Sequence, residues 1–115
     1  MITVWHNPRC SKSRQTLALI DATGQPVSIR RYLESPPSLS ELEAARQALD
    51  LRPIEMMRTG ERLFNELALG KDTDDDDLMQ AMAAHPILIE RPIVFKDARA
   101  IIGRPPEAVK PLLAD

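Results

Sequence analysis

The sequence contains a single cysteine, Cys10, among its 115 residues. One cysteine cannot close an internal disulfide, and we therefore expect a protein of the reducing cytoplasm. Aromatic residues make up only 3% of the chain, which argues against a surface that stacks nucleic-acid bases. The formal net charge is only −2, so neither nucleic acid nor an anionic membrane is expected as a partner.

Long apolar runs are absent too. No window holds the roughly 20 uncharged apolar residues of a membrane helix, and the start "MITVWHNPRC" lacks the basic and apolar regions of a secretory signal. The chain has 43% hydrophobic and 28% charged residues, a composition typical of globular proteins. At this length we expect one domain over residues 1–115 with one modest core.

The first third of the chain predicts a strand–helix–strand unit. The β-branched and aromatic run "ITVW", residues 2–5, predicts a buried strand, and the turn-forming "HNPR" follows it. Residues 11–22 carry apolar side chains at helical spacing and are followed by Gly24 and Pro26, which predicts a helix. "VSIRRYL", residues 27–33, predicts a second strand. Two strands joined by one helix are expected to be parallel neighbours.

The middle of the chain predicts a helical insertion at about residues 38–85. Ser38 or Ser40 can cap its first helix, and "PIEMM", "GERLFNELAL" and "DDDDLMQAMAAH" predict further helical pieces. The acidic run is interpreted as a solvated helix start, because it lacks the glycine and the terminal glutamate of a calcium loop. His6 and His85 with one cysteine do not form a zinc pattern, so no metal site is expected.

The last part of the chain predicts an antiparallel hairpin and a closing helix. Residues 91–102 form two β-rich runs around a tight turn at Asp97-Ala98. Pro105 or Pro106 can occupy the first turn of the final helix, where a missing N–H is harmless. The fold class is therefore α/β, with helices packed on a four-stranded mixed sheet, in the order β-α-β, helical insertion, β-β-α.

The surroundings of Cys10 predict a reactive thiol. If a helix begins at Ser11, its unpaired N–H groups and its dipole favour a thiolate on Cys10. The neighbouring cations are Arg9, Lys12, Arg14 and, when protonated, His6. Positive charge of this kind lowers a cysteine pKa. Ser13 lies one turn on, where its hydroxyl could donate to the sulfur and where a disulfide oxidoreductase would carry a second cysteine.

A free cysteine is often an inert, buried core residue. On composition alone we would favour that reading, but a polar, cationic turn before a helix is an unusual place for a core side chain. His6 by itself is more often structural than catalytic, and Asn7-Pro8 can be a simple turn in which Asn7 hydrogen-bonds the loop. If Cys10 is the nucleophile, no second cysteine can resolve its adduct, and the electrons must come from an external thiol.

Four segments together resemble one known family. "HNPRCSKSR", residues 6–14, resembles the His-Asn-Pro-x-Cys-x-x-Ser-Arg motif of glutaredoxin-coupled arsenate reductases. "MMRTGE", "HPILIERPIVF" and "IGRPPE" are similar to the segments that carry the family's three anion-binding arginines, matching Arg58, Arg91 and Arg104. The resemblance runs through nearly the whole chain and is strongest to a short subgroup. It implies a thioredoxin-like fold with a helical insertion.

The resemblance also implies a mechanism and a set of partners. Cys10 would attack arsenate, glutathione would attack the adduct, and glutaredoxin would release arsenite, with no bound cofactor. We separately expect the protein to be a monomer. The implied catalytic residues are His6, Cys10, Ser13 and Arg14, the oxyanion-binding residues are Arg58, Arg91 and Arg104, and the structural residues near the site are Asn7 and Pro92. A cis bond before Pro92 is implied as well. The planar paired donors of arginine match a tetrahedral oxyanion.

Other interpretations stand beside this one. Taken singly, each of the three arginines would be read as a solvated helix residue or a surface ion pair. A site of this kind can also serve another oxidised substrate. Related thioredoxin-like proteins bind RNA polymerase as regulatory modules, and their redox-switching members typically carry Cys-x-x-Cys. This chain has Cys10-Ser11-Lys12-Ser13 instead, which disfavours a disulfide switch without excluding binding.

Overall fold

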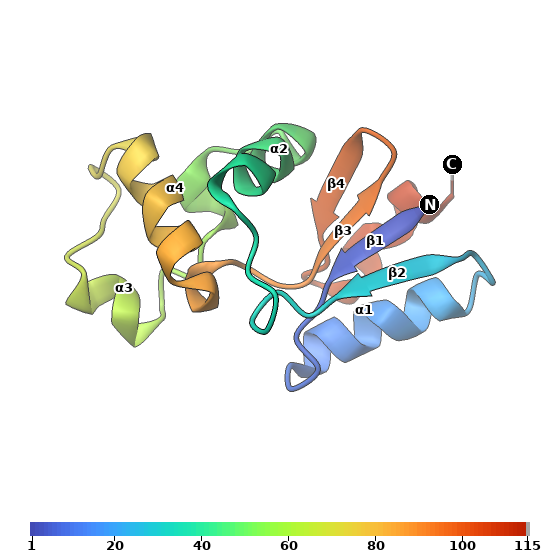
Figure 1. Cartoon of the computed structure of the whole chain (residues 1–115). Coiled ribbons are helices and arrows are strands. Elements are labelled where there is room, and N and C mark those ends of the chain that lie inside the picture. Colours follow the sequence, from blue (N-terminus) through green and yellow to red (C-terminus); the bar gives the residue numbers. More distant parts are fainter. Residues whose placement is uncertain (115) are drawn as a thin grey trace. The chain divides into compact units, whose positions relative to one another are not determined.

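Four short strands form one mixed sheet in the order β2-β1-β3-β4 (Figure 1). They are β1 (Ile2–Trp5), β2 (Val27–Arg30), β3 (Ile93–Lys96) and β4 (Arg99–Ile102). β1 pairs in parallel with β2 and antiparallel with β3, and β3 pairs antiparallel with β4. The computed structural model describes residues 1–114, and within them it confirms the four-stranded mixed sheet.

The helix α1 (Ser11–Asp21) connects β1 to β2 and completes the predicted strand–helix–strand unit. β2 ends at Arg30, three residues earlier than expected. The strand was expected to continue through residues 31–33, but the chain turns there because the N–H groups of Glu34 and Ser35 donate to the carbonyl of Arg31. Tyr32 is nevertheless buried, at 1% exposure. Its aromatic side chain therefore packs in the interior from a turn and not from a strand.

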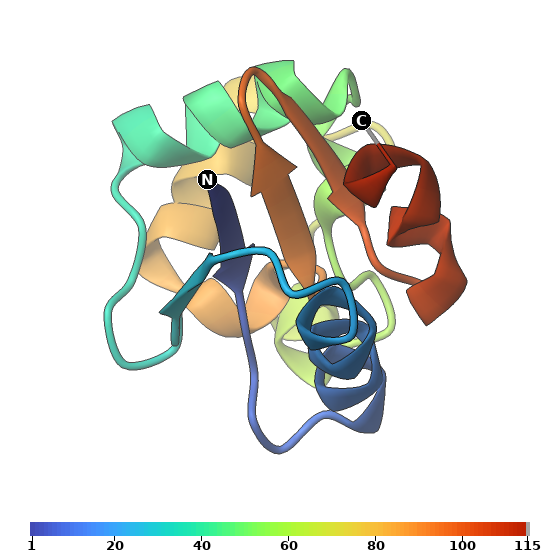
Figure 2. The same cartoon turned by 90° about the vertical axis from the view of Figure 1, so that its right-hand side faces the viewer.

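The hairpin and the C-terminal helical segment complete this part of the fold. Asp97 has φ +57° in the tight turn between β3 and β4, where the sequence predicted it. Pro106 opens the 3₁₀ helix Pro106–Val109, which continues into α5 (Lys110–Leu113). This segment and α1 lie on the same side of the sheet (Figure 2).

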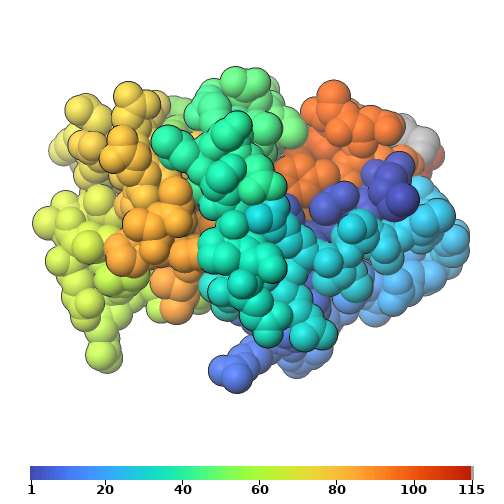
Figure 3. All heavy atoms as spheres, viewed as in Figure 1, coloured from blue at the N-terminus to red at the C-terminus, as the bar shows by residue number. Residues whose placement is uncertain are grey.

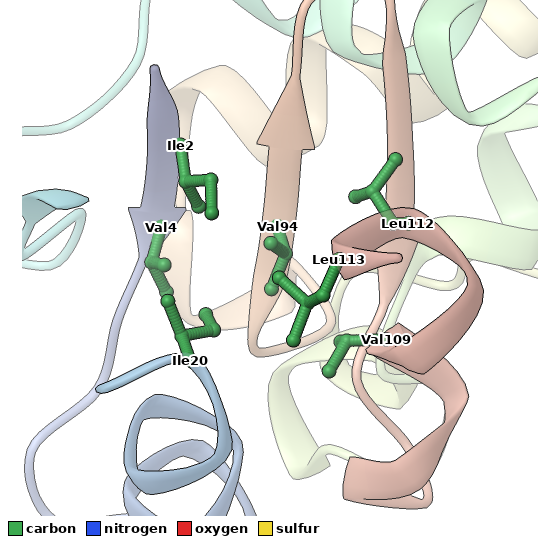
Figure 4. Packing of buried hydrophobic residues seen from close by; sticks show 7 residues of the cluster. All are labelled: Ile2, Val4, Ile20, Val94, Val109, Leu112 and Leu113. Carbon is green, nitrogen blue, oxygen red and sulfur yellow. The ribbon is translucent and has the colours of Figure 1, made fainter. Parts of the chain in front are cut away.

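The hydrophobic core of this part lies between the sheet and those helical segments (Figure 4). Its buried members are Ile2, Val4, Ile20, Val94, Val109, Leu112 and Leu113. They come from β1, α1, β3 and the C-terminal segment, so elements from both ends of the chain bury one another's apolar side chains. This core supports α1, and Cys10 precedes the first residue of that helix.

The chain divides into two compact units, one of residues 1–35 with the segment from residue 91 onward, and one of residues 36–90. The second unit is helical. Its elements are α2 (Leu39–Leu49), the 3₁₀ helix Pro53–Met56, α3 (Arg62–Glu66), α4 (Asp75–Ala84) and the 3₁₀ helix Pro86–Leu88. Ser38, and not Ser40, caps α2, in a capping box with Glu41. Among residues 1–114, no helix is both long enough and apolar enough to cross a membrane.

Candidate active site

Cys10 is the N-cap residue of α1, as the sequence predicted. Its backbone is extended, with φ −95° and ψ 123°, and its carbonyl accepts the first helical hydrogen bond from the Arg14 N–H at 3.0 Å. The side chain is 9% exposed. The turn between β1 and α1 projects at the surface of the first unit (Figure 3). A thiol at this position meets the unpaired N–H groups of a helix start and remains within reach of solvent.

The turn before Cys10 is built by hydrogen bonds to its own backbone. The Asn7 side-chain oxygen accepts from the Arg9 N–H at 3.0 Å, and the Asn7 carbonyl accepts from the Cys10 N–H at 3.0 Å. The Arg14 guanidinium donates to the Pro8 carbonyl at 2.9 Å. Asn7 thus shapes the loop through an Asx turn, and Arg14 clamps the loop from the helix.

The Ser13 hydroxyl is directed at His6, whereas the Ser13 backbone N–H acts on the sulfur of Cys10. The Ser13 hydroxyl lies 2.7 Å from His6 Nδ1 and accepts from the Asn7 N–H at 3.1 Å. The Ser13 hydroxyl thus joins the imidazole of His6 to the backbone of the loop. The Ser13 backbone N–H, and not the hydroxyl, is the group of this residue that acts on the Cys10 thiol, and it lowers the pKa of that thiol.

His6 is a neutral member of the site near pH 7. It is 6% exposed, and burial lowers its pKa below the ordinary 6.5, with the charges of Arg31 and Arg14 acting in the same direction. His6 therefore holds Ser13 in place and does not supply the positive charge that the sequence suggested.

Two distant arginines meet beside Cys10. Arg104 Nη1 lies 3.8 Å from Cys10 Sγ and 3.4 Å from the Arg91 carbonyl. These residues stand more than 80 positions from Cys10 in the sequence, and the sheet brings them together because β3 begins just after Arg91 and β4 ends just before Gly103. The structure thus groups His6, Cys10, Ser13, Arg91 and Arg104 within the first unit.

These contacts set the ionisation of Cys10. Burial alone raises the pKa of the thiol. That effect is outweighed by the Ser13 and Lys12 backbone N–H groups, the charge of Arg91 and the hydrogen bond from Arg104, and the net pKa lies below the ordinary 9.0. Residues 1–35 and 91–115 together carry ten Lys or Arg against five Asp or Glu, so the surrounding field also favours a thiolate.

Because Cys10 is the chain's one cysteine, its ionisation can be measured without interference. We expect the pH midpoint of its alkylation by iodoacetamide to lie lower in the folded protein than in the same protein unfolded in urea. A lowered folded-state pKa stabilises the fold at pH values above the unfolded pKa, and that contribution is lost as pH falls through the folded value. Equal midpoints in the folded and unfolded protein would contradict a lowered pKa.

The remaining predicted residues lie as follows. Arg58 is in the second unit, where its guanidinium pairs with Glu61 at 2.8 Å, and its role as an anion ligand stays a prediction. The peptide bond before Pro92 is cis, as the resemblance implied, and the bond before Pro105 is cis as well, which the sequence reasoning did not foresee. Within residues 1–114, no three His, Cys, Asp or Glu residues are grouped to hold a metal ion.

Sequence reasoning missed the role of Thr16. Its side chain is fully buried, and its one hydroxyl hydrogen is shared between the carbonyls of Lys12 and Gly103, at 2.9 and 3.2 Å. A signal was present in the spacing, because Cys10, Ser13 and Thr16 recur every three residues and share one side of α1. Polar side chains in a row on the buried side of a helix indicate hydrogen-bond partners in other elements of the fold.

Comparison with known proteins agrees with this geometry. The sequence model of the ArsC family matches residues 5–112. The chain is 43% identical over 114 residues to an arsenate reductase of Neisseria meningitidis serogroup A, covering 97% of both chains. It is 41% identical over 114 residues to an arsenate reductase of Haemophilus influenzae, covering 97% of this chain and 98% of the relative.

A solved structure is similar as well. The arsenate reductase of Vibrio cholerae superposes with a TM-score of 0.91 at 47% identity, covering 96% of this chain and 95% of that protein. The likeness confirms the predicted thioredoxin-like α/β fold.

Proposed function

The chain belongs to the ArsC family, and from that premise we propose that it is an arsenate reductase in which Cys10 is the nucleophile and glutathione and glutaredoxin supply the electrons. The observation that carries the proposal is the contact of Arg104 Nη1 with Cys10 Sγ at 3.8 Å, at the start of a helix. A guanidinium beside a thiolate can hold an anion against the nucleophile that attacks it.

Arsenate presents the charge and shape that this site favours. It is a tetrahedral oxyanion with negative charge near neutral pH, and it would be repelled by an isolated thiolate. Arg91 and Arg104 offset that repulsion from within the first unit, and we propose Arg58 as the third arginine of the oxyanion site. The paired N–H groups of each guanidinium match the spacing of two oxyanion oxygens.

The proposed reaction begins when Cys10 Sγ forms a bond to arsenic and one arsenate oxygen leaves as water. Glutathione then attacks arsenic through its thiol, and a second oxygen leaves as water. A glutaredoxin thiol attacks the glutathione sulfur, which breaks the bond between that sulfur and arsenic, forms a mixed disulfide and leaves As(III) on Cys10. Water then cleaves the bond between Cys10 Sγ and arsenic and releases arsenite. Two external thiols become a disulfide, and their two electrons reduce As(V) to As(III), while Cys10 returns as a thiol. Cys10 is the one cysteine in the sequence, so these electrons cannot come from this chain. The need for reduced glutathione suits the reducing cytoplasm.

A reconstituted assay tests the proposal. The purified protein is mixed with arsenate, glutathione, glutaredoxin, glutathione reductase and NADPH, and both NADPH oxidation and arsenite are measured. We expect arsenite formation that requires every component, with a clear loss of rate when glutaredoxin is omitted. Arsenite no higher than in the protein-free mixture would reject the function. Inactivity together with stoichiometric recovery of RNA polymerase in a pull-down would favour the regulatory module instead.

A further inference from the structure

Two hydrogen bonds at Gly103 join the three chain segments that form the first-unit site. The one hydroxyl hydrogen of Thr16, on α1, is shared between the Lys12 carbonyl at 2.9 Å and the Gly103 carbonyl at 3.2 Å, and Gly103 lies 87 residues away in the sequence. The Gly103 N–H donates to the Pro92 carbonyl at 2.9 Å. The two bonds together link α1, the segment after Arg91 and the segment before Arg104.

The packing at this contact leaves no room for a larger residue. A Cβ built on Gly103 would lie 2.7 Å from Thr16 Oγ1, 2.9 Å from Thr16 Cγ2 and 3.0 Å from Pro92 Cγ. These separations are well below ordinary van der Waals distance, and the Thr16 side chain is short and fully buried. The backbone of Gly103 can approach α1 this closely because glycine has no side chain.

Arg104 follows Gly103 directly, so the contact between Thr16 and Gly103 determines the position of the Arg104 backbone. Its guanidinium reaches back to Cys10 Sγ and to the Arg91 carbonyl. Cys10 and Thr16 belong to the same helix, and the distance between them is set by helical geometry. Fixing Gly103 on Thr16 thereby fixes the backbone of Arg104 relative to the sulfur.

We propose that Thr16 and Gly103 are positioning residues that hold the Arg104 guanidinium against Cys10, the thiol that the proposed arsenate chemistry uses. A hydroxyl at position 16 is necessary because it satisfies the buried Gly103 carbonyl, and a methyl group in its place would leave that carbonyl without this donor. The expected effect on arsenate binding rests on the proposed function. The expected effect on the pKa of the Cys10 thiol does not depend on arsenate.

The test compares Thr16→Val, which keeps the shape and removes the hydroxyl, with Thr16→Ser, which keeps the hydroxyl. In Thr16→Val we expect the pH midpoint of Cys10 alkylation to rise, and the KM for arsenate to increase by roughly tenfold, the scale of one charge-assisted hydrogen bond. The value of kcat measured above the new midpoint should change much less. Thr16→Ser should restore both the midpoint and the KM. Gly103→Ala should behave like Thr16→Val.

A double variant separates positioning from a general loss of stability. With Arg104→Ala already present, adding Thr16→Val should shift the alkylation midpoint no further, because the side chain that Thr16 positions is gone. Additive shifts in the double variant, or an unshifted midpoint in folded Thr16→Val, would overturn the proposal. The midpoint is measured without arsenate, so a wild-type protein that fails to reduce arsenate would reject the proposed function while leaving this inference standing.

Discussion

Replacing Cys10 with serine is expected to reduce arsenate reduction to the rate of the protein-free mixture, a loss of about 10³-fold or more. Serine is nearly the same size and is a favoured N-cap residue, so the loop around Asn7 should keep its shape. Its hydroxyl remains protonated near neutral pH, however, and therefore provides no anionic nucleophile to attack arsenic. The measurement is arsenite formation with glutathione and glutaredoxin under saturating arsenate.

The control for this variant is Gln15→Ala, an exposed position on the same helix, which should retain the wild-type rate. Far-ultraviolet circular dichroism should be the same for both variants. Activity that survives in Cys10→Ser would show that the thiol is not the nucleophile. That result would also contradict the proposed order of bond formation.

Replacing Arg91 with alanine is expected to raise the KM for arsenate by about 10- to 100-fold, which corresponds to the roughly 1.5–3 kcal/mol of a hydrogen bond to a charged group. The same variant should raise the alkylation midpoint of Cys10, because the Arg91 charge helps to lower the pKa of that thiol. Arg91→Lys separates the two effects. It keeps the positive charge and so keeps the midpoint low, while it loses the paired donors and still binds arsenate weakly.

Arg99→Ala provides the matched control, since Arg99 is exposed on β4 and has no assigned role in the site. It should leave both the arsenate KM and the alkylation midpoint near the wild-type values. An unchanged KM in Arg91→Ala would remove Arg91 from the oxyanion site. Equal effects of Arg91→Ala and Arg99→Ala would assign the result to the general positive charge of the first unit.

Local patterns were enough to predict most of the elements of the fold. Residues 2–5 form a strand because their β-branched and aromatic run fits a buried strand, and one of the two serines that the sequence offered as caps of α2, Ser38, is the N-cap residue. The pattern misled at residues 31–33, where Tyr32 is buried in a turn. Burial and strand structure produce the same apolar pattern in a short run, and only the hydrogen bonds distinguish them.

In the candidate site, too, some features follow from the sequence and others only from the tertiary structure. By itself the sequence determined that the thiol stands at a helix N-terminus and that any adduct on it must be resolved from outside, because both follow from neighbouring residues and from the count of cysteines. The tertiary structure alone decided that Arg104 reaches the sulfur, that the Ser13 hydroxyl turns to His6, and that Thr16 holds Gly103. Those contacts depend on how the sheet and α1 pack, and packing brings together residues whose separation along the chain carries no information about their distance in space.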